Sequence, residues 1–255
     1  MATAVKFEGI TDELQEILDT NLDEAPARRR VREAFKEIQL GTARKLASSG
    51  YGVFAMDYPG FGLSDGLHGY IPKLDLLVDD VVEHFSKVKE NQEYKSIPSF
   101  LFGQSMGGAV ALKVHFKQPN AWDGAILSAP MCKIADNMVP HWLVTKLLIG
   151  IAKFFPRAKL VPHNNFGDLA FGDLKKREQN VTLPLLILQG EGDVVTDPSV
   201  SKALYEKASS RDKKILFYKD GCHALCEGDT DETISQVFVD VISWLDEHSM
   251  RNTPC

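Results

Sequence analysis

The chain has 255 residues, of which 44% are hydrophobic and 25% charged, and its net charge is −6 at pH 7. This length and balance predict one globular domain with a sizeable core. Proteins that bind nucleic acid usually present a basic face, so the negative charge argues against nucleic acid as a partner.

The first 56 residues predict helices followed by one strand. Residues 11–40 follow a helical pattern interrupted at Pro26, and we expect residues 1–40 to form an N-terminal helical extension. Residues 42–49 predict a short helix that ends at Gly50, because glycine tolerates the left-handed backbone of a helix C-terminus. The apolar run Gly52–Met56 then predicts a buried strand that ends at Asp57.

From residue 72 onward, helices and strands alternate along the chain. An amphipathic helix is expected over residues 72–91, and further helices over 107–117 and 231–247. Short apolar runs predict strands at 99–103, 124–128, 183–189 and 214–218. Such alternation predicts an α/β fold, in which helices cover both faces of a mostly parallel sheet. We assign residues 41–249 to this domain and 250–255 to a tail.

The alternation breaks between residues 131 and 180. This segment contains the apolar run Trp142–Phe155, which is interrupted by two lysines, Lys146 and Lys153. The run is too short and too charged to span a membrane. An insertion above the carboxyl ends of a parallel sheet is a common place for a substrate lid. We therefore expect a cap or lid here, with an ordinary packing helix as the alternative.

A candidate nucleophile is Ser105, in the sequence Gly103-Gln104-Ser105-Met106-Gly107. An apolar strand is expected before it and a helix rich in small residues after it. A Gly-x-Ser-x-Gly sequence in that context predicts a sharp turn that exposes the serine at the end of a strand. The glycines would allow the strand and helix backbones to approach each other closely.

A serine needs a base to take its proton, and in folds of this type the acid and then the histidine follow the serine along the chain. Asp193 lies in the loop after the predicted strand 183–189. Asp197, its rival, precedes Pro198 and is typical of a helix N-cap. Of the seven histidines, only His223 both follows the acid and lies in the loop after the last predicted strand. We therefore assign His223 as the base and Asp193 as its orienting acid.

The cysteines and the N-terminus give expectations about compartment and cofactor. Cys132, Cys222, Cys226 and Cys255 match no disulfide framework, which is typical of a reducing compartment. Cys222, His223 and Cys226 have no second ligand pair, so we expect no metal. The acidic N-terminus does not resemble a signal peptide. We expect a cytoplasmic protein.

Several motifs resemble the monoacylglycerol lipase branch of the α/β-hydrolases, including its plant members and caffeoylshikimate esterases. They are Asp57–Ser64, Gly103–Gly108, Gly190–Asp193 and Cys222–Glu227, with further similarity at Pro119–Trp122 and Ala129–Asp136. The resemblance implies hydrolysis of carboxylic esters through an acyl-enzyme, without metal or cofactor. It also implies that the Met106 amide is one oxyanion donor. The expected substrate is a small-molecule ester, either a monoacylglycerol or a lysophospholipid-type lipid. The lid would touch membranes peripherally.

Two departures from this family keep other functions open. The strands and the His-Gly turn that members carry before the helix at 42–49 are missing, and the cap is shortened near Leu174–Arg177. The chain therefore resembles a truncated isoform that lacks one oxyanion donor and has reduced stability. The alternatives are a phenolic esterase of the caffeoylshikimate type, and a catalytically impaired or non-catalytic protein with the hydrolase fold.

Overall fold

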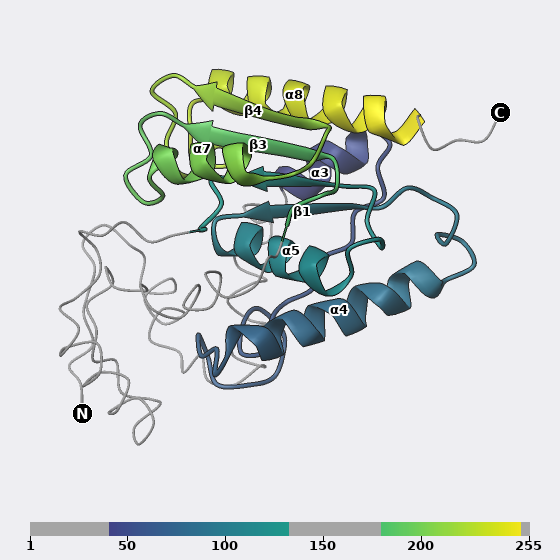
Figure 1. Ribbon diagram of the computed structural model, residues 1–255. Coiled ribbons are helices and arrows are strands. Elements are labelled where there is room, and N and C mark those ends of the chain that lie inside the picture. The colour runs from purple at the N-terminus through teal and green to yellow at the C-terminus, as the bar shows by residue number, and fades with distance from the viewer. Residues whose placement is uncertain (1–40, 133–179, 251–255) are drawn as a thin grey trace, which may run out of the picture.

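A four-stranded parallel sheet lies at the centre of the computed structural model, which describes residues 41–132 and 180–250 (Figure 1). The strands follow one another in the sheet in the order of the chain. They are β1 (Phe100–Gln104), β2 (Gly124–Ser128), β3 (Leu185–Gly190) and β4 (Lys213–Tyr218). Phe100 pairs with Gly124, Ala125 with Leu185, and Leu185 with Lys213. All four strands were expected, with bounds within two residues of these.

Helices cover both faces of the sheet, as the alternation predicted (Figure 1). One face carries α4 (Leu74–Glu90), α5 (Met106–Lys117) and α7 (Pro198–Lys207), and the other carries α3 (Gly41–Ser48) and α8 (Asp231–Met250). Gly50 has φ +93° just after α3, so the predicted glycine stop is confirmed. No helix among the described residues is long and apolar enough to cross a membrane.

The buried strand β3 divides the core into two layers. Leu185 and Ile187 face α4 and α5, while Leu186 and Leu188 face α8, and all four side chains are fully buried. Successive side chains of a strand point to opposite faces, so an uninterrupted apolar run fits a strand covered on both sides. Burying each such side chain contributes roughly 1.5–3 kcal/mol. The apolar core therefore fixes the position of β3, which precedes Asp193.

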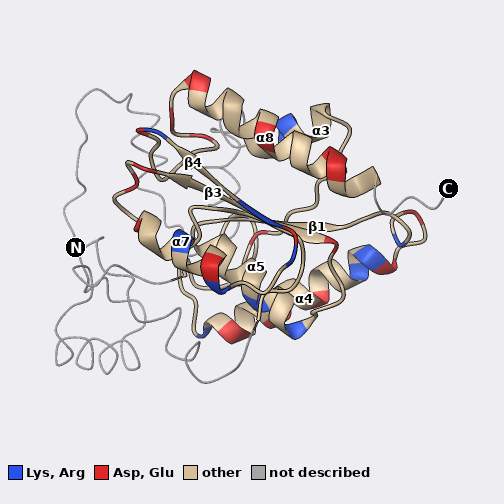
Figure 2. Cartoon of the chain, turned by 45° about the horizontal axis from the view of Figure 1, so that its top comes forward, with Lys and Arg blue, Asp and Glu red and all other residues tan. Residues whose placement is uncertain are grey.

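Charged residues of both signs are interspersed over the outer surfaces of the helices (Figure 2). Two ion pairs join α4 to α5: Lys113 lies 2.7 Å from Asp75, and Lys117 pairs with Asp79 one turn further along. These pairs are partly exposed, so each contributes at most about 1 kcal/mol. They hold α4 in register with the helix that follows Ser105.

The prediction of a buried strand at Gly52–Met56 is wrong. These residues form no strand, and the side chains of Val53 and Phe54 are 39% and 45% exposed. A strand needs a neighbour to accept its backbone hydrogen bonds, and β1 pairs only with β2 among the described residues. Without a neighbouring strand, the apolar run at 52–56 remains irregular chain.

Other predictions fall outside the described residues. These are the N-terminal extension 1–40, residues 251–255 of the predicted tail 250–255, and residues 133–179 of the predicted cap 131–180, which include the Trp142–Phe155 run.

We predict that the amides of β1 exchange with solvent in two classes. The Ser105 N–H donates to Ser128, and by strand alternation the amides of Leu101 and Gly103 also face β2. Those of Phe100, Phe102 and Gln104 face the other edge of β1, which no described strand covers. Hydrogen exchange followed by NMR should therefore show Leu101 and Gly103 protected by several orders of magnitude more than Phe102. Equal protection of all five amides would mean that another strand covers this edge.

Candidate active site

The carboxyl edge of the sheet collects the three predicted catalytic side chains. Ser105 directly follows β1, Asp193 lies three residues beyond β3, and His223 lies five residues beyond β4. Because all strands are parallel, their carboxyl ends lie at one edge, where ligand sites of such sheets are found. Each of the three residues thus follows a different strand of the sheet.

Ser105 has the strained backbone that the motif predicts. Its φ is +52° and its ψ −119°, a conformation that non-glycine residues rarely adopt. The turn is tight: a Cβ on Gly103 would lie 2.4 Å from the Gly107 carbonyl oxygen, and one on Gly108 would lie 2.8 Å from Pro130. A Cβ on Gly107 would meet no atom within 4 Å, so only part of the predicted glycine role is confirmed.

Backbone hydrogen bonds hold the elbow against the loop after β2. The Ser105 N–H donates to Ser128 at 2.9 Å, and the Met131 N–H donates to the Ser105 carbonyl at 3.0 Å. Met106 is the first residue of α5, and its N–H has no backbone acceptor among the described residues. First-turn amides of a helix lack intrahelical partners and favour negative charge. The Met106 amide is therefore available to an oxyanion.

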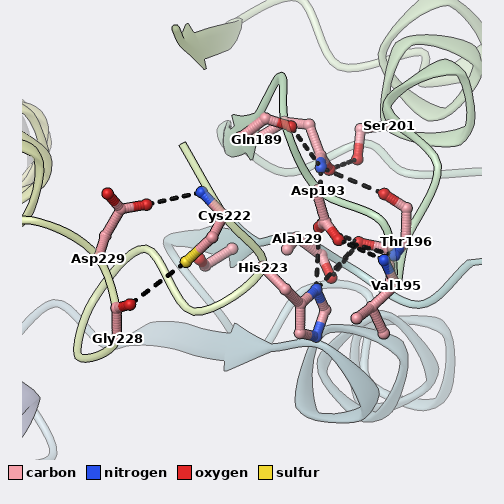
Figure 3. Close-up of polar contacts among 12 residues, drawn as sticks. Ala129, Gln189, Asp193, Val195, Thr196, Ser201, Cys222, His223, Gly228 and Asp229 are labelled. Carbon is pink, nitrogen blue, oxygen red and sulfur yellow. Dashed lines mark hydrogen bonds and ion pairs between the residues drawn. The ribbon is translucent and has the colours of Figure 1, made fainter. Parts of the chain in front are cut away.

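Asp193 is buried among neutral donors (Figure 3). Its Oδ1 accepts the backbone amides of Val195 at 2.8 Å and Thr196 at 2.9 Å. Its Oδ2 accepts the Thr196 hydroxyl at 2.6 Å, the Gln189 amide at 3.0 Å and the His223 ring at 2.9 Å. Burial by itself would raise the pKa of Asp193, but hydrogen bonds from His223 and Thr196 and from the two amides lower that pKa to about 2. The carboxylate is thus ionised at neutral pH.

The hydrogen bond to Asp193 also fixes the tautomer of His223. An ionised carboxylate only accepts, so Nδ1 of His223 must carry the proton, which leaves Nε2 free to accept one. The Thr196 hydroxyl lies 3.3 Å from the same Nδ1. The hydrogen bonds of the described residues include none between Ser105 and His223. Catalytic hydrogen bonds are often long in the absence of substrate and shorten when it binds.

The rival acid Asp197 has the structural role that its sequence context indicated. Its Oδ1 accepts the Ser199 amide at 2.8 Å, which caps the N-terminus of α7, and Pro198 is the first residue of that helix. His223 pairs with Asp193 and not with Asp197.

The loops of Asp193 and His223 approach each other closely because of Gly190. A Cβ at that position would lie 2.2 Å from the Gly221 carbonyl oxygen. The Glu191 amide donates to Tyr218 at 3.0 Å, which joins the ends of β3 and β4. On the other side of the histidine loop, Asp229 accepts the Cys222 amide at 2.6 Å (Figure 3). The backbone on the N-terminal side of His223 is therefore fixed.

Three polar residues around Asp193 were missed from the sequence: Gln189, Thr196 and Ser201. Their side chains are almost completely buried. One signal was present, since Gln189 is a polar residue at the end of an otherwise apolar strand. A buried amide needs hydrogen-bond partners, which places other polar groups near it.

Cys222 and Cys226 do not form a metal site with His223. The described residues contain no group of three or more His, Cys, Asp or Glu side chains suited to a metal ion. The three cysteines that the structure describes, Cys132, Cys222 and Cys226, are free thiols. Burial raises the pKa of Cys226 to about 11, so its thiol is protonated at neutral pH.

We predict that substituting Asp193 lowers turnover, whereas substituting Asp197 lowers stability. Asp193→Asn should lower the kcat for ester hydrolysis by about 10⁴-fold, because a neutral amide favours the wrong tautomer of the base. Asp197→Ala should keep the kcat but lower the unfolding free energy by about 1 kcal/mol through loss of the helix cap. Kinetics and denaturant unfolding of both variants provide the measurement. A larger kinetic loss in Asp197→Ala would exchange the two roles.

The low pKa of Asp193 predicts a pH-dependent contribution to stability. A carboxyl group whose pKa falls on folding, here from 3.8 to about 2, stabilises the folded state above its unfolded pKa. This stabilisation is lost as the pH falls through the folded value. The difference in unfolding free energy between the wild type and Asp193→Asn should therefore be constant above about pH 5 and shrink between pH 4 and 2. A difference that stays constant down to pH 2 would contradict this.

Comparisons with known proteins show the family of the chain. The model of the serine aminopeptidase S33 family matches residues 33–172 and 166–231. The caffeoylshikimate esterase of Arabidopsis thaliana is 34% identical over 235 residues, which cover 79% of this chain and 71% of that protein. The monoglyceride lipase of mouse (Mus musculus) is 25% identical over 223 residues, which cover 76% of this chain and 72% of that protein.

Solved structures agree on the fold. A soluble variant of Saccharomyces cerevisiae monoglyceride lipase, solved with a substrate analogue, superposes with a TM-score of 0.68 at 23% identity, over 84% of this chain and 82% of that one. The chain therefore has the α/β-hydrolase fold and belongs to the serine aminopeptidase S33 family.

Proposed function

We propose that this chain hydrolyses carboxylic esters through an acyl-enzyme, with a monoacylglycerol or related lipid as substrate. The observation that carries the proposal is the hydrogen bond between Asp193 and His223. These two residues lie in the loops after β3 and β4, and the strained Ser105 follows β1 of the same sheet. An oriented base and a serine nucleophile therefore lie at the same edge of the sheet.

The proposed reaction has two stages. Nε2 of His223 takes the Ser105 proton as Oγ attacks the ester carbonyl, and the Met106 amide donates to the resulting oxyanion. The tetrahedral intermediate collapses when the alcohol leaves with the proton from His223. Water then attacks the acyl-serine, His223 accepts a proton from it, and the carboxylic acid is released as Ser105 is reprotonated. Throughout, Asp193 remains ionised and stabilises the protonated ring.

The relatives support this reaction class and suggest two kinds of ester. Relatives named monoglyceride lipase occur in mammals and in yeast, and a viral relative is named monoglyceride lipase homolog. The caffeoylshikimate esterase shares more identity with this chain, 34%, which supports a phenolic ester as the second candidate. The apolar run Trp142–Phe155 favours the lipid. Contact of this run with a membrane surface stays a prediction from the sequence, and so does a cytoplasmic location of the protein.

A chain-length series is the decisive test of the substrate. Each buried methylene contributes about 0.8 kcal/mol, or about fourfold in kcat/KM, so monoacylglycerols with longer acyl chains should be hydrolysed progressively faster than the acetyl ester. Ser105→Ala should lose both this activity and covalent labelling by a fluorophosphonate. Ser99→Ala, directly before the start of β1, is the matched control and should keep both.

Each result has a distinct meaning. Labelling that persists in Ser105→Ala would show that Ser105 is not the nucleophile. A clear preference for caffeoylshikimate over every monoacylglycerol would replace the lipid with the phenolic ester and leave the mechanism intact.

A further inference from the structure

Gln189 is a buried polar residue next to the candidate acid. It lies in β3 after a run of leucine and isoleucine, and its side chain is fully buried. Its Nε2 lies 3.0 Å from Oδ2 of Asp193, 3.2 Å from the Gly190 carbonyl and 3.3 Å from the Thr196 carbonyl. The amide therefore faces three acceptors, which lie at the end of β3 and on the loop that carries Asp193.

Ser201 contacts the oxygen of this amide, and the three acceptors at its nitrogen determine which way it points. The Ser201 hydroxyl, buried on α7, donates to Oε1 of Gln189 at 2.6 Å (Figure 3). A flipped amide would place Oε1 against a carboxylate and two carbonyl oxygens, none of which can donate. Such a buried arrangement would leave several polar groups unsatisfied, at a high cost in free energy. The orientation of Gln189 is thus unique.

We propose that Gln189, held by Ser201, is a positioning residue that fixes the Asp193 carboxylate for His223, an inference that rests on the proposed function. The hydrogen bonds run without a break from Ser201 through Gln189 and Asp193 to His223. They connect helix α7 to the catalytic base.

The geometry around Oδ2 explains why this donor matters. Oδ2 accepts from Gln189, Thr196 and His223, while Oδ1 accepts from two backbone amides. No lysine or arginine contacts the carboxylate among the described residues, and His223 is its one titratable partner there. Neutral donors therefore hold the charge of Asp193. Removing one of them makes the carboxylate more basic and leaves it held by fewer hydrogen bonds, so the ring of His223 is oriented less precisely.

This role should affect turnover rather than substrate affinity. Because Gln189 has no exposed surface, it does not contact substrate, and its loss should lower kcat while KM stays unchanged. The test uses Gln189→Met, which has a similar shape without the N–H donor, together with Ser201→Ala and the double variant. The chain also contains a matched control pair, since Gln118 donates to Ser86 at 3.0 Å where α5 ends, away from Ser105.

We expect Gln189→Met to lower kcat by about 10- to 100-fold, as loss of an outer partner of a functional group typically does. The acid limb of its kcat/KM profile should move to higher pH, because a more basic carboxylate favours the protonated imidazole. Ser201→Ala should have a smaller effect in the same direction and should add nothing in the Gln189→Met background. Gln118→Met and Ser86→Ala should leave kcat and the acid limb unchanged.

NMR provides a readout that does not depend on turnover. In ¹⁵N-histidine-labelled protein, the Nδ1 proton of His223 should be identifiable because its resonance disappears in His223→Ala. This resonance should change position in Gln189→Met and stay in place in Gln118→Met. Thermal unfolding of every variant checks that the fold is retained.

The outcomes separate this inference from the proposed function. If Gln189→Met leaves kcat, the acid limb and the His223 resonance unchanged, the positioning role is wrong. If the double variant shows the sum of the two single effects, Ser201 does not act through Gln189. If the wild type hydrolyses no ester while the resonance still responds to Gln189→Met, the proposed function fails and the positioning role stands.

Discussion

The site depends on one buried charge, the carboxylate of Asp193. Removing a carboxylate from water is expensive, and it usually needs a nearby cation or several hydrogen bonds. Here two amides, one hydroxyl, one side-chain amide and the ring of His223 supply these bonds. The same bonds that make the buried charge tolerable also fix its orientation. The direction of the His223 ring therefore depends on the hydrogen bonds that offset the desolvation of the Asp193 carboxylate.

These hydrogen bonds to Asp193 require the chain to turn in a particular way after β3. Gly190 lets the backbone approach Gly221, and the next residues fold back so that the Val195 and Thr196 amides face the carboxylate. The cap of α7 by Asp197 follows directly. Two neighbouring aspartates thus have different roles because one faces the inside of the turn and the other begins a helix. Stability and chemistry are combined within one short segment.

Much of this arrangement could be predicted from the sequence, and the exceptions have physical causes. The four strands were recognisable because each is a short apolar run, and the Ser105 elbow because Gly103 and Gly108 are needed for close packing. The same criterion failed for Gly52–Met56, since apolar composition says nothing about whether a partner strand is present. Gln189 and Ser201 were missed because their hydrogen bond joins residues 12 apart on different elements. Local patterns do not encode such a pairing.

The edge of β1 that no described strand covers bears on how precisely Ser105 can be held. In the described chain β2 is the one hydrogen-bonded neighbour of β1, so the elbow depends on β2 and its loop for its position. The Ser105 and Met131 amides provide two hydrogen bonds, and the contact of Gly108 with Pro130 fixes the start of α5. His223, by contrast, is held from the β3 side through Asp193. The serine and the base therefore rest on different supports, and their alignment depends on the rigidity of β2 and β3 between them. Both strands are fully buried over the residues that pair, from Ala125 to Ser128 and from Leu185 to Leu188, so the core that stabilises the fold also sets the relative position of nucleophile and base.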